Sequence, residues 1–149
     1  MTNSYETDFS AWAFQQAALL KAGQWESLDI ENLVEEMESM GRSELRALES
    51  RMVNLIAHLL KWAYQPDYRG NSWKRTIVEN RVQIPRLIKF SPALKKYFEN
   101  PEWILDIWLD AVKTAAGETG IAKSDFPVEP IWTMYQILDD DFYPDSQLF

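Results

Sequence analysis

The sequence predicts an all-α fold, a single-domain antiparallel bundle of four main helices with a short C-terminal helix at about residues 131–138. Apolar residues recur at helical spacing along nearly the whole chain, and no stretch alternates long enough to predict a strand. The five glycines stand singly at the boundaries of these periodic segments. A chain of 149 residues with 46% hydrophobic content can bury one core. We therefore expect one helical domain over residues 1–149.

The first predicted helix covers residues 8–22. Thr7 is the candidate N-cap, because a hydroxyl there can accept a hydrogen bond from the first free backbone amides. Aromatic and aliphatic side chains supply its apolar faces. Gly23 is the predicted end of the helix, since glycine adopts the left-handed conformation that commonly follows a last helical turn.

The second predicted helix is long, over residues 30–64. Asp29 is its candidate N-cap, and acidic residues in the first turn complement the positive end of the helix dipole. The apolar stripe shifts by about one residue after Gly41. One continuous helix with a local adjustment at Gly41 is our preferred interpretation, and a hairpin at that glycine is the alternative.

The third predicted helix covers residues 73–89, after a turn of proline, glycine and asparagine. Ser72 is its candidate N-cap. Pro85 should kink it, because proline lacks the backbone donor and crowds the preceding turn.

The fourth helical region is predicted to begin at Ser91 and to begin again at Asn100, where Pro101 suits the first turn of a helix. Its broad apolar face ends near Gly117 or Gly120. Pro85 and the Asn100–Pro101 pair therefore interrupt the third and fourth helical regions without ending the helical pattern.

The charges are distributed unevenly along this acidic protein. Residues 61–96 hold nine Lys or Arg and two acids, a net charge of plus 7, whereas the whole chain carries minus 8. The simpler interpretation is that acidic helices neutralise the basic segment within the fold. The other is a docking face for a phosphate or an acidic partner. The acidity of the whole chain argues against nucleic acid, whose binding depends on phosphate neutralisation.

Localisation is indicated by what the sequence lacks. There are no cysteines, which excludes disulfides and thiolate chemistry and fits a reducing compartment. The first residues are acidic where a signal peptide would be basic, and no stretch approaches the length of a membrane span. We expect a cytoplasmic protein that does not contact a membrane.

Nearly the whole chain resembles one known family. The matching segments are YETDFSAWAFQQAALLKAG, LDIENLVEEMESMGRSE, HLLKWAYQP, NSWKRTI with Arg81, and ILDDDFYP. They are similar to the family catalogued as domain of unknown function 29. The resemblance implies an all-helical bacterial domain that usually stands alone and has no assigned activity. It supplies no catalytic residues.

Most catalytic chemistries are excluded by the residues present. A di-iron bundle needs Glu-x-x-His motifs, but Leu55 stands three residues before His58, the only histidine. One histidine and no cysteine also argue against a transition-metal site. No nucleophile elbow and no phosphate-binding glycine loop is present. We expect no metal and no cofactor, and whether the protein is an enzyme is left open, with a non-enzymatic role preferred.

Three polar residues are weak candidates for a catalytic or ligand-binding centre: Glu36, His58 and Arg81. Arg81 falls on the apolar side of its helix, so it is either a buried cation that pairs with Glu36 or a surface arginine with its stem along the core edge. His58 is most simply a boundary residue packed on Trp62. In one continuous helix Glu36 and His58 would be about 33 Å apart, so only the hairpin permits a shared centre.

The preferred function is a non-enzymatic protein-interaction module that uses the basic, aromatic-rich central segment. Arg, Trp and Tyr are the residue types that dominate interface energies. The partner would be an acidic protein or a second copy of the chain. The candidate partner-binding residues are Lys61, Tyr64, Tyr68, Arg69, Trp73, Lys74 and Arg75.

Overall fold

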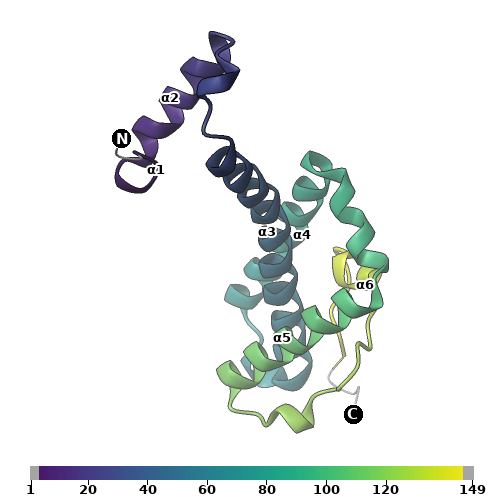
Figure 1. The fold of residues 1–149 in the computed structure, drawn as a ribbon. Coiled ribbons are helices and arrows are strands. Elements are labelled where there is room, and N and C mark those ends of the chain that lie inside the picture. Colours follow the sequence, from purple (N-terminus) through teal and green to yellow (C-terminus); the bar gives the residue numbers. More distant parts are fainter. Residues whose placement is uncertain (1–3, 146–149) are drawn as a thin grey trace. The chain divides into compact units, whose positions relative to one another are not determined.

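The computed structural model describes residues 4–145, and every regular element in that part of the chain is helical (Figure 1). The predicted all-α fold with four main helices and a short last helix is confirmed. The α-helices are α1 (Ser4–Thr7), α2 (Phe9–Lys21), α3 (Ile30–Tyr64), α4 (Asn71–Phe90), α5 (Pro101–Thr119) and α6 (Met134–Leu138). The 3-10 helices are η1 (Trp25–Ser27), η2 (Pro66–Tyr68), η3 (Pro92–Glu99) and η4 (Lys123–Asp125).

The chain divides into two compact units, Met1–Ser43 and Glu44–Phe149. Helix α3 contributes its first part to the N-terminal unit and the rest to the C-terminal unit. The expectation of one domain over residues 1–149 stays a prediction, and both ends of that range lie outside the described residues.

Helix α2 and its N-cap each begin one residue later than predicted. Asp8, and not Thr7, is the N-cap, and its Oδ1 accepts a hydrogen bond from the amide of Ala11 at 3.1 Å. Thr7 belongs instead to the short helix α1, which the apolar pattern did not reveal. Gly23 follows the helix with a φ of 71°, the left-handed conformation predicted for it.

Asp29 connects the start of α3 to α2 within the N-terminal unit. Its Oδ1 accepts from the amide of Asn32 at 3.4 Å, as the predicted cap requires, and its Oδ2 accepts from Trp12 Nε1 at 2.9 Å. Its own amide donates to Gln16 Oε1 at 2.8 Å. From Asp29 onward α3 is continuous through Gly41, so the hairpin alternative is not formed.

Helix α4 runs antiparallel to the C-terminal part of α3. Lys61 near the end of α3 lies over the ring of Trp73 near the start of α4, with 5.3 Å from Nζ to the ring centroid. Arg51, ten residues earlier in α3, donates to Asn80, further along α4, at 3.4 Å. This order of contacts requires opposite directions.

Helix α5 contacts the same part of α3 but runs in the same direction. Trp103 Nε1 at its start donates to Glu49 Oε2 at 3.0 Å, and Glu118 at its end pairs with Lys61 at 2.6 Å. The η3 segment connects the end of α4 to the start of α5, so that α5 can run opposite to α4 and in the same direction as α3. Figure 1 shows α5 crossing α3 in the C-terminal unit.

The core lies in the C-terminal unit, where α3 supplies most of the fully buried side chains. The largest of these are Trp108, Leu48, Met52, Leu55, Ile56, Leu59, Leu60, Ile77, Ile84 and Ile137. The segment after α5 completes the core, because Trp132 packs on Trp108 with ring centroids 5.4 Å apart and Phe142 packs on Trp132 at 5.6 Å.

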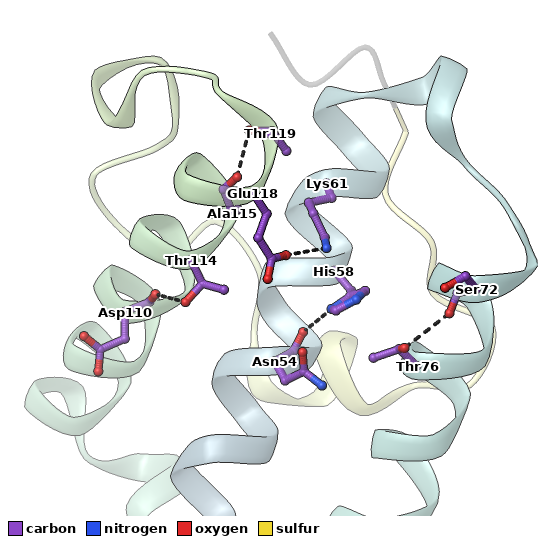
Figure 2. Close-up of polar contacts among 10 residues, drawn as sticks. All are labelled: Asn54, His58, Lys61, Ser72, Thr76, Asp110, Thr114, Ala115, Glu118 and Thr119. Atoms are coloured by element: carbon purple, nitrogen blue, oxygen red, sulfur yellow. Dashed lines mark hydrogen bonds and ion pairs between the residues drawn. The ribbon is translucent and has the colours of Figure 1, made fainter.

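Helix α4 begins earlier than predicted, at Asn71 with Gly70 in the cap position. The prediction of Ser72 as the cap is wrong, because Ser72 lies in the first turn and its carbonyl accepts from Thr76 Oγ1 at 3.2 Å (Figure 2). Pro85 lies inside α4, which continues past it to Phe90. The kink predicted at Pro85 stays a prediction.

The ends of α5 confirm the predicted restart at Asn100. Its side chain accepts hydrogen bonds from the amides of Glu102 at 3.0 Å and Trp103 at 3.3 Å, and Pro101 occupies the first helical position. At the other end Gly120 closes the helix with a φ of 78°, a conformation that glycine adopts without steric cost.

Candidate functional site

The predicted partner-binding segment divides into an inward and an outward group. Lys61 belongs to the inward group, because it is only 6% exposed. Its ammonium pairs with Glu118 at 2.6 Å (Figure 2) and lies 5.3 Å from the ring centroid of Trp73, itself half-buried. A buried ammonium held by a carboxylate and an aromatic ring is part of the packing between α3, α4 and α5.

Two further candidates, Arg69 and Tyr64, also turn inward. Arg69 Nε donates to the carbonyl of Trp62 at 2.8 Å, and its guanidinium lies 5.2 Å from the centroid of the Trp62 ring. The ring of Tyr64 packs on Phe126 at 4.5 Å. Burial, with the charge of Asp125, raises the pKa of Tyr64 to about 12. These side chains hold the turn between α3 and α4 in place.

The outward group consists of Tyr68, which is 70% exposed, Lys74 and Arg75. The last two belong to an exposed face that continues along the whole of α4. We define the basic α4 face by six exposed residues: Lys74, Arg75, Val78, Val82, Arg86 and Lys89. At 100° per residue these six side chains fall within an arc of about 120°. Exposed Asn71 and Pro85 lie within the same arc, and the exposed carboxylate of Glu79 lies beside it.

The basic α4 face combines charge with apolar surface. Val78 and Val82 are 48% and 44% exposed and lie one turn apart at its centre, flanked by four cations. None of these cations makes an ion pair within residues 4–145. Lys74 contacts the ring of Tyr143, at 5.9 Å from Nζ to the centroid. The α4 cations thus remain without the carboxylate partner that Lys61 has.

Arg81 lies on the opposite, buried side of α4 and is only 4% exposed. The predicted pairing with Glu36 is wrong, because main-chain carbonyls accept its hydrogen bonds. Nε donates to Ile137 at 2.9 Å, Nη2 to Phe142 at 2.7 Å and Nη1 to Asp140 at 3.4 Å. A planar guanidinium suits several acceptors in one plane, and its role here is to fasten the C-terminal segment to α4.

Glu36 has its own partner within the N-terminal unit. It accepts a hydrogen bond from the hydroxyl of Tyr5 at 2.5 Å, and this bond raises the pKa of Tyr5 to about 12. Tyr5 in turn packs on Trp12 at 4.8 Å between ring centroids. Glu36, His58 and Arg81 therefore have three different sets of partners, which does not support the catalytic centre proposed for them.

The comparisons with known proteins give one result. The family model described as "Domain of unknown function DUF29" matches residues 4–143. The chain belongs to this family. No curated protein and no solved structure matches the chain. Membership in DUF29 confirms the resemblance seen in the sequence and assigns no activity.

Two further findings describe what the DUF29 domain lacks over residues 4–145. No cluster of three or more His, Cys, Asp or Glu side chains there is arranged to hold a metal ion. No helix within the same range combines the length and apolar character needed to cross a bilayer.

A polar groove of about 1070 Å³ lies between α3 and α5 of the DUF29 domain. Charges of both signs line it, among them Arg51 and Asp110, together with Asn54 and Glu118. His58 is one turn beyond Asn54 and is not among the lining residues. The groove therefore does not place the histidine in a pocket.

His58 itself is half-buried, and its Nδ1 donates to the carbonyl of Asn54 at 2.8 Å (Figure 2). Burial lowers the pKa of His58 and the charge of Lys61 lowers it further, while the bond to Asn54 and the charge of Glu118 oppose them. The side chain is therefore neutral near pH 7. Its predicted packing on Trp62 stays a prediction.

We expect His58 to make the domain less stable as the pH falls below neutral. The folded pKa lies below the ordinary value of 6.5, so the unfolded chain binds more protons than the folded chain in this range. The free energy of unfolding should therefore fall as the pH drops through the ordinary value of 6.5 toward the lower folded pKa. Urea denaturation at a series of pH values measures this slope. A His58→Gln variant should show a flatter one, and an equal slope in both proteins would contradict the assignment.

Sequence reasoning missed four of the six residues of the basic α4 face in this DUF29 domain: Val78, Val82, Arg86 and Lys89. The candidate residues were chosen within residues 61–75 because the turn there is rich in aromatic side chains. A signal was nevertheless present, because Val78 and Val82 form an apolar pair at i and i+4 on the side opposite Ile77 and Ile84. A second apolar stripe on a helix whose first stripe is already buried indicates a surface available for binding.

Proposed function

We propose that this DUF29 domain is a protein-interaction module whose basic α4 face binds an acidic surface of a partner protein. The observation that carries this proposal is the group of four exposed cations around two exposed valines, without intramolecular ion pairs in the described chain. An apolar centre with a charged rim is the usual anatomy of a protein interface.

The chemistry of the face favours binding over catalysis. It contains no histidine, serine or carboxylate pair that could transfer a proton or attack a substrate. The whole chain carries a net charge of minus 8, which opposes its approach to a negatively charged nucleic acid. A protein surface needs less neutralisation than a phosphate backbone and can use the valines as well as the cations.

Charge reversal on the face tests this function. The variant Lys74→Glu, Arg75→Glu, Arg86→Glu should lose the proteins that the immobilised wild-type domain captures from a lysate of its native cell. Its helical circular dichroism should be unchanged, since all three side chains are exposed. The matched control is Lys95→Glu, Lys113→Glu, Lys123→Glu, which makes the same change in charge at exposed lysines elsewhere.

The outcome is decided by comparing the two variants. Loss of the captured proteins with the α4 variant alone supports the proposed function. Equal capture by the wild-type protein and the α4 variant would overturn it. Equal loss with both variants would also overturn it, because net charge rather than the face would then explain the binding.

A further inference from the structure

The N-terminal unit leaves an apolar stripe of α3 exposed. Ile30, Val34 and Met37 follow one another at helical spacing and are 57%, 49% and 64% exposed. At 100° per residue they fall within an arc of about 60°, so they form one continuous strip on the helix. Burial of such a strip would be favourable by about 25 cal/mol per Å² of apolar surface.

The short helices of this unit contact α3 on another side. Their hydrogen bonds reach Asp29, from Trp12 at 2.9 Å, and Glu36, from Tyr5 at 2.5 Å. Asp29 and Glu36 lie about 100° to 120° around α3 from Ile30. Helices α1 and α2 are therefore held by polar contacts beside the stripe and do not cover it.

The N-terminal unit also has little core of its own. Within its described residues, Trp12 is the one apolar side chain that is more than nine-tenths buried. A unit of about 40 residues with so little buried surface does not normally stay folded without additional contacts. An exposed apolar stripe on such a unit is a place for those contacts.

The stripe has an acidic border. Glu31, Glu35 and Glu38 are exposed and lie next to it, and Arg42 pairs with two of them, Glu35 at 3.5 Å and Glu38 at 3.6 Å. Residues 1–43 contain eight acids and two basic residues. Together the stripe and its border, which we call the acidic α3 face, should attract an apolar surface that carries positive charge.

The basic α4 face has this complementary chemistry. Val78 and Val82 stand at i and i+4, as do Ile30 and Val34. Four cations and one carboxylate, that of Glu79, lie around the valines, whereas three carboxylates and one cation, Arg42, border the stripe. We propose that the acidic α3 face of one copy of the chain binds the basic α4 face of a second copy. This inference rests on the proposed function and names the partner of that face.

The charges determine the pairing mode. Two acidic faces repel each other, and so do two basic faces, whereas an acidic face and a basic face attract. Each copy can therefore give its acidic face to the partner's basic face and receive the partner's acidic face in return. A reciprocal exchange of this kind has two-fold symmetry, and the dimer is the assembly that the proposal predicts.

A charge-swap experiment tests the proposal on the full chain. The first variant, Glu31→Lys, Glu35→Lys, Glu38→Lys, makes the α3 face basic. The second, Lys74→Glu, Arg75→Glu, Arg86→Glu, makes the α4 face acidic. Sedimentation equilibrium over the micromolar range measures the apparent molecular mass at each protein concentration. For the wild-type chain this mass should rise with concentration toward that of a dimer, and for each variant alone it should stay at that of the monomer.

The equimolar mixture of the two variants provides the decisive result. Its faces are complementary again, so it should recover a dimer of one copy of each variant. A matched control, Asp106→Lys, Asp110→Lys, Glu129→Lys, changes exposed acids away from both faces and should dimerise like the wild-type chain. High salt should weaken the wild-type dimer, a readout that needs no variant.

Three outcomes overturn the proposal. One is a wild-type chain that stays monomeric at every concentration, another is a mixture that does not associate, and the third is dimerisation of either variant alone. If the wild-type chain is monomeric while the α4 variant still loses its captured partner, the proposed function stands and only this inference fails. If that variant keeps its captured proteins, the proposed function fails as well.

Discussion

Replacing Arg81 with alanine should lower the free energy of unfolding by about 3 to 5 kcal/mol. The guanidinium donates to the carbonyls of Ile137, Asp140 and Phe142, and the residue is 4% exposed. Without Arg81, the carbonyl of the buried residue Ile137 loses its donor, at a cost of about 1 to 3 kcal/mol. The carbonyl of half-buried Phe142 also loses its donor, and the removed side chain leaves a void among its buried neighbours.

The Arg81→Ala prediction is measured by chemical denaturation beside an Arg86→Ala control. Arg86 lies on the same helix but is exposed, so its loss should change the stability by less than about 0.5 kcal/mol. Arg81→Lys should recover only part of the loss, because an ammonium cannot present the planar fork that reaches several carbonyls. Equal stabilities for Arg81→Ala and Arg86→Ala would contradict the assigned role.

Replacing Trp108 with alanine should have an effect of similar size, about 3 to 5 kcal/mol. Trp108 is fully buried, packs on Trp132 at 5.4 Å, and donates from Nε1 to the carbonyl of Pro127 at 2.9 Å. The substitution therefore leaves both a cavity and a carbonyl without its donor.

Trp108→Phe separates these two contributions, because phenylalanine refills most of the cavity but cannot donate to Pro127. It should cost less than Trp108→Ala. Trp25→Ala is the control, since Trp25 is 62% exposed. Thermal and denaturant unfolding that place Trp108→Ala within about 1 kcal/mol of the wild-type protein would show that Trp108 is not part of a rigid core.

Local signals in the sequence were sufficient to predict the main helices and most of their ends. Asn100 beside Pro101 and Gly120 predicted the ends of α5, because a cap requires only residues within one turn. The buried side of α4 also follows from the sequence, because Ile77 and Ile84, both fully buried, stand at helical spacing and periodicity is a local property. The caps of α2 and α4 were misplaced by one or two residues, because several polar residues compete at each start.

Partners across the fold could not be predicted in the same way. Arg81 was recognised as out of place among apolar residues, but its acceptors lie in a segment about 60 residues later, and backbone carbonyls leave no sequence signal. Lys61 was assigned to a binding surface because of its basic neighbours. Its pairing with Glu118 depends on α5 lying against α3, which periodicity does not specify.

The same limitation explains why the candidate site shifted along the chain. Composition identified the basic segment but not which side of each helix faces solvent. The structure places Lys61 and Arg69 in the packing and leaves Lys74 and Arg75 exposed. The basic α4 face is therefore proposed from exposure and missing ion pairs, which only coordinates reveal.

Lysine reactivity in the complex recovered on the immobilised domain tests most directly whether the basic α4 face is the binding surface. Acetylation rates measured by mass spectrometry compare each lysine in the free and the bound domain. We expect Lys74 and Lys89 to react several-fold more slowly when bound, while Lys95 and Lys123 keep their free rates. Unchanged rates at Lys74 and Lys89, with protection of other lysines, would contradict the account.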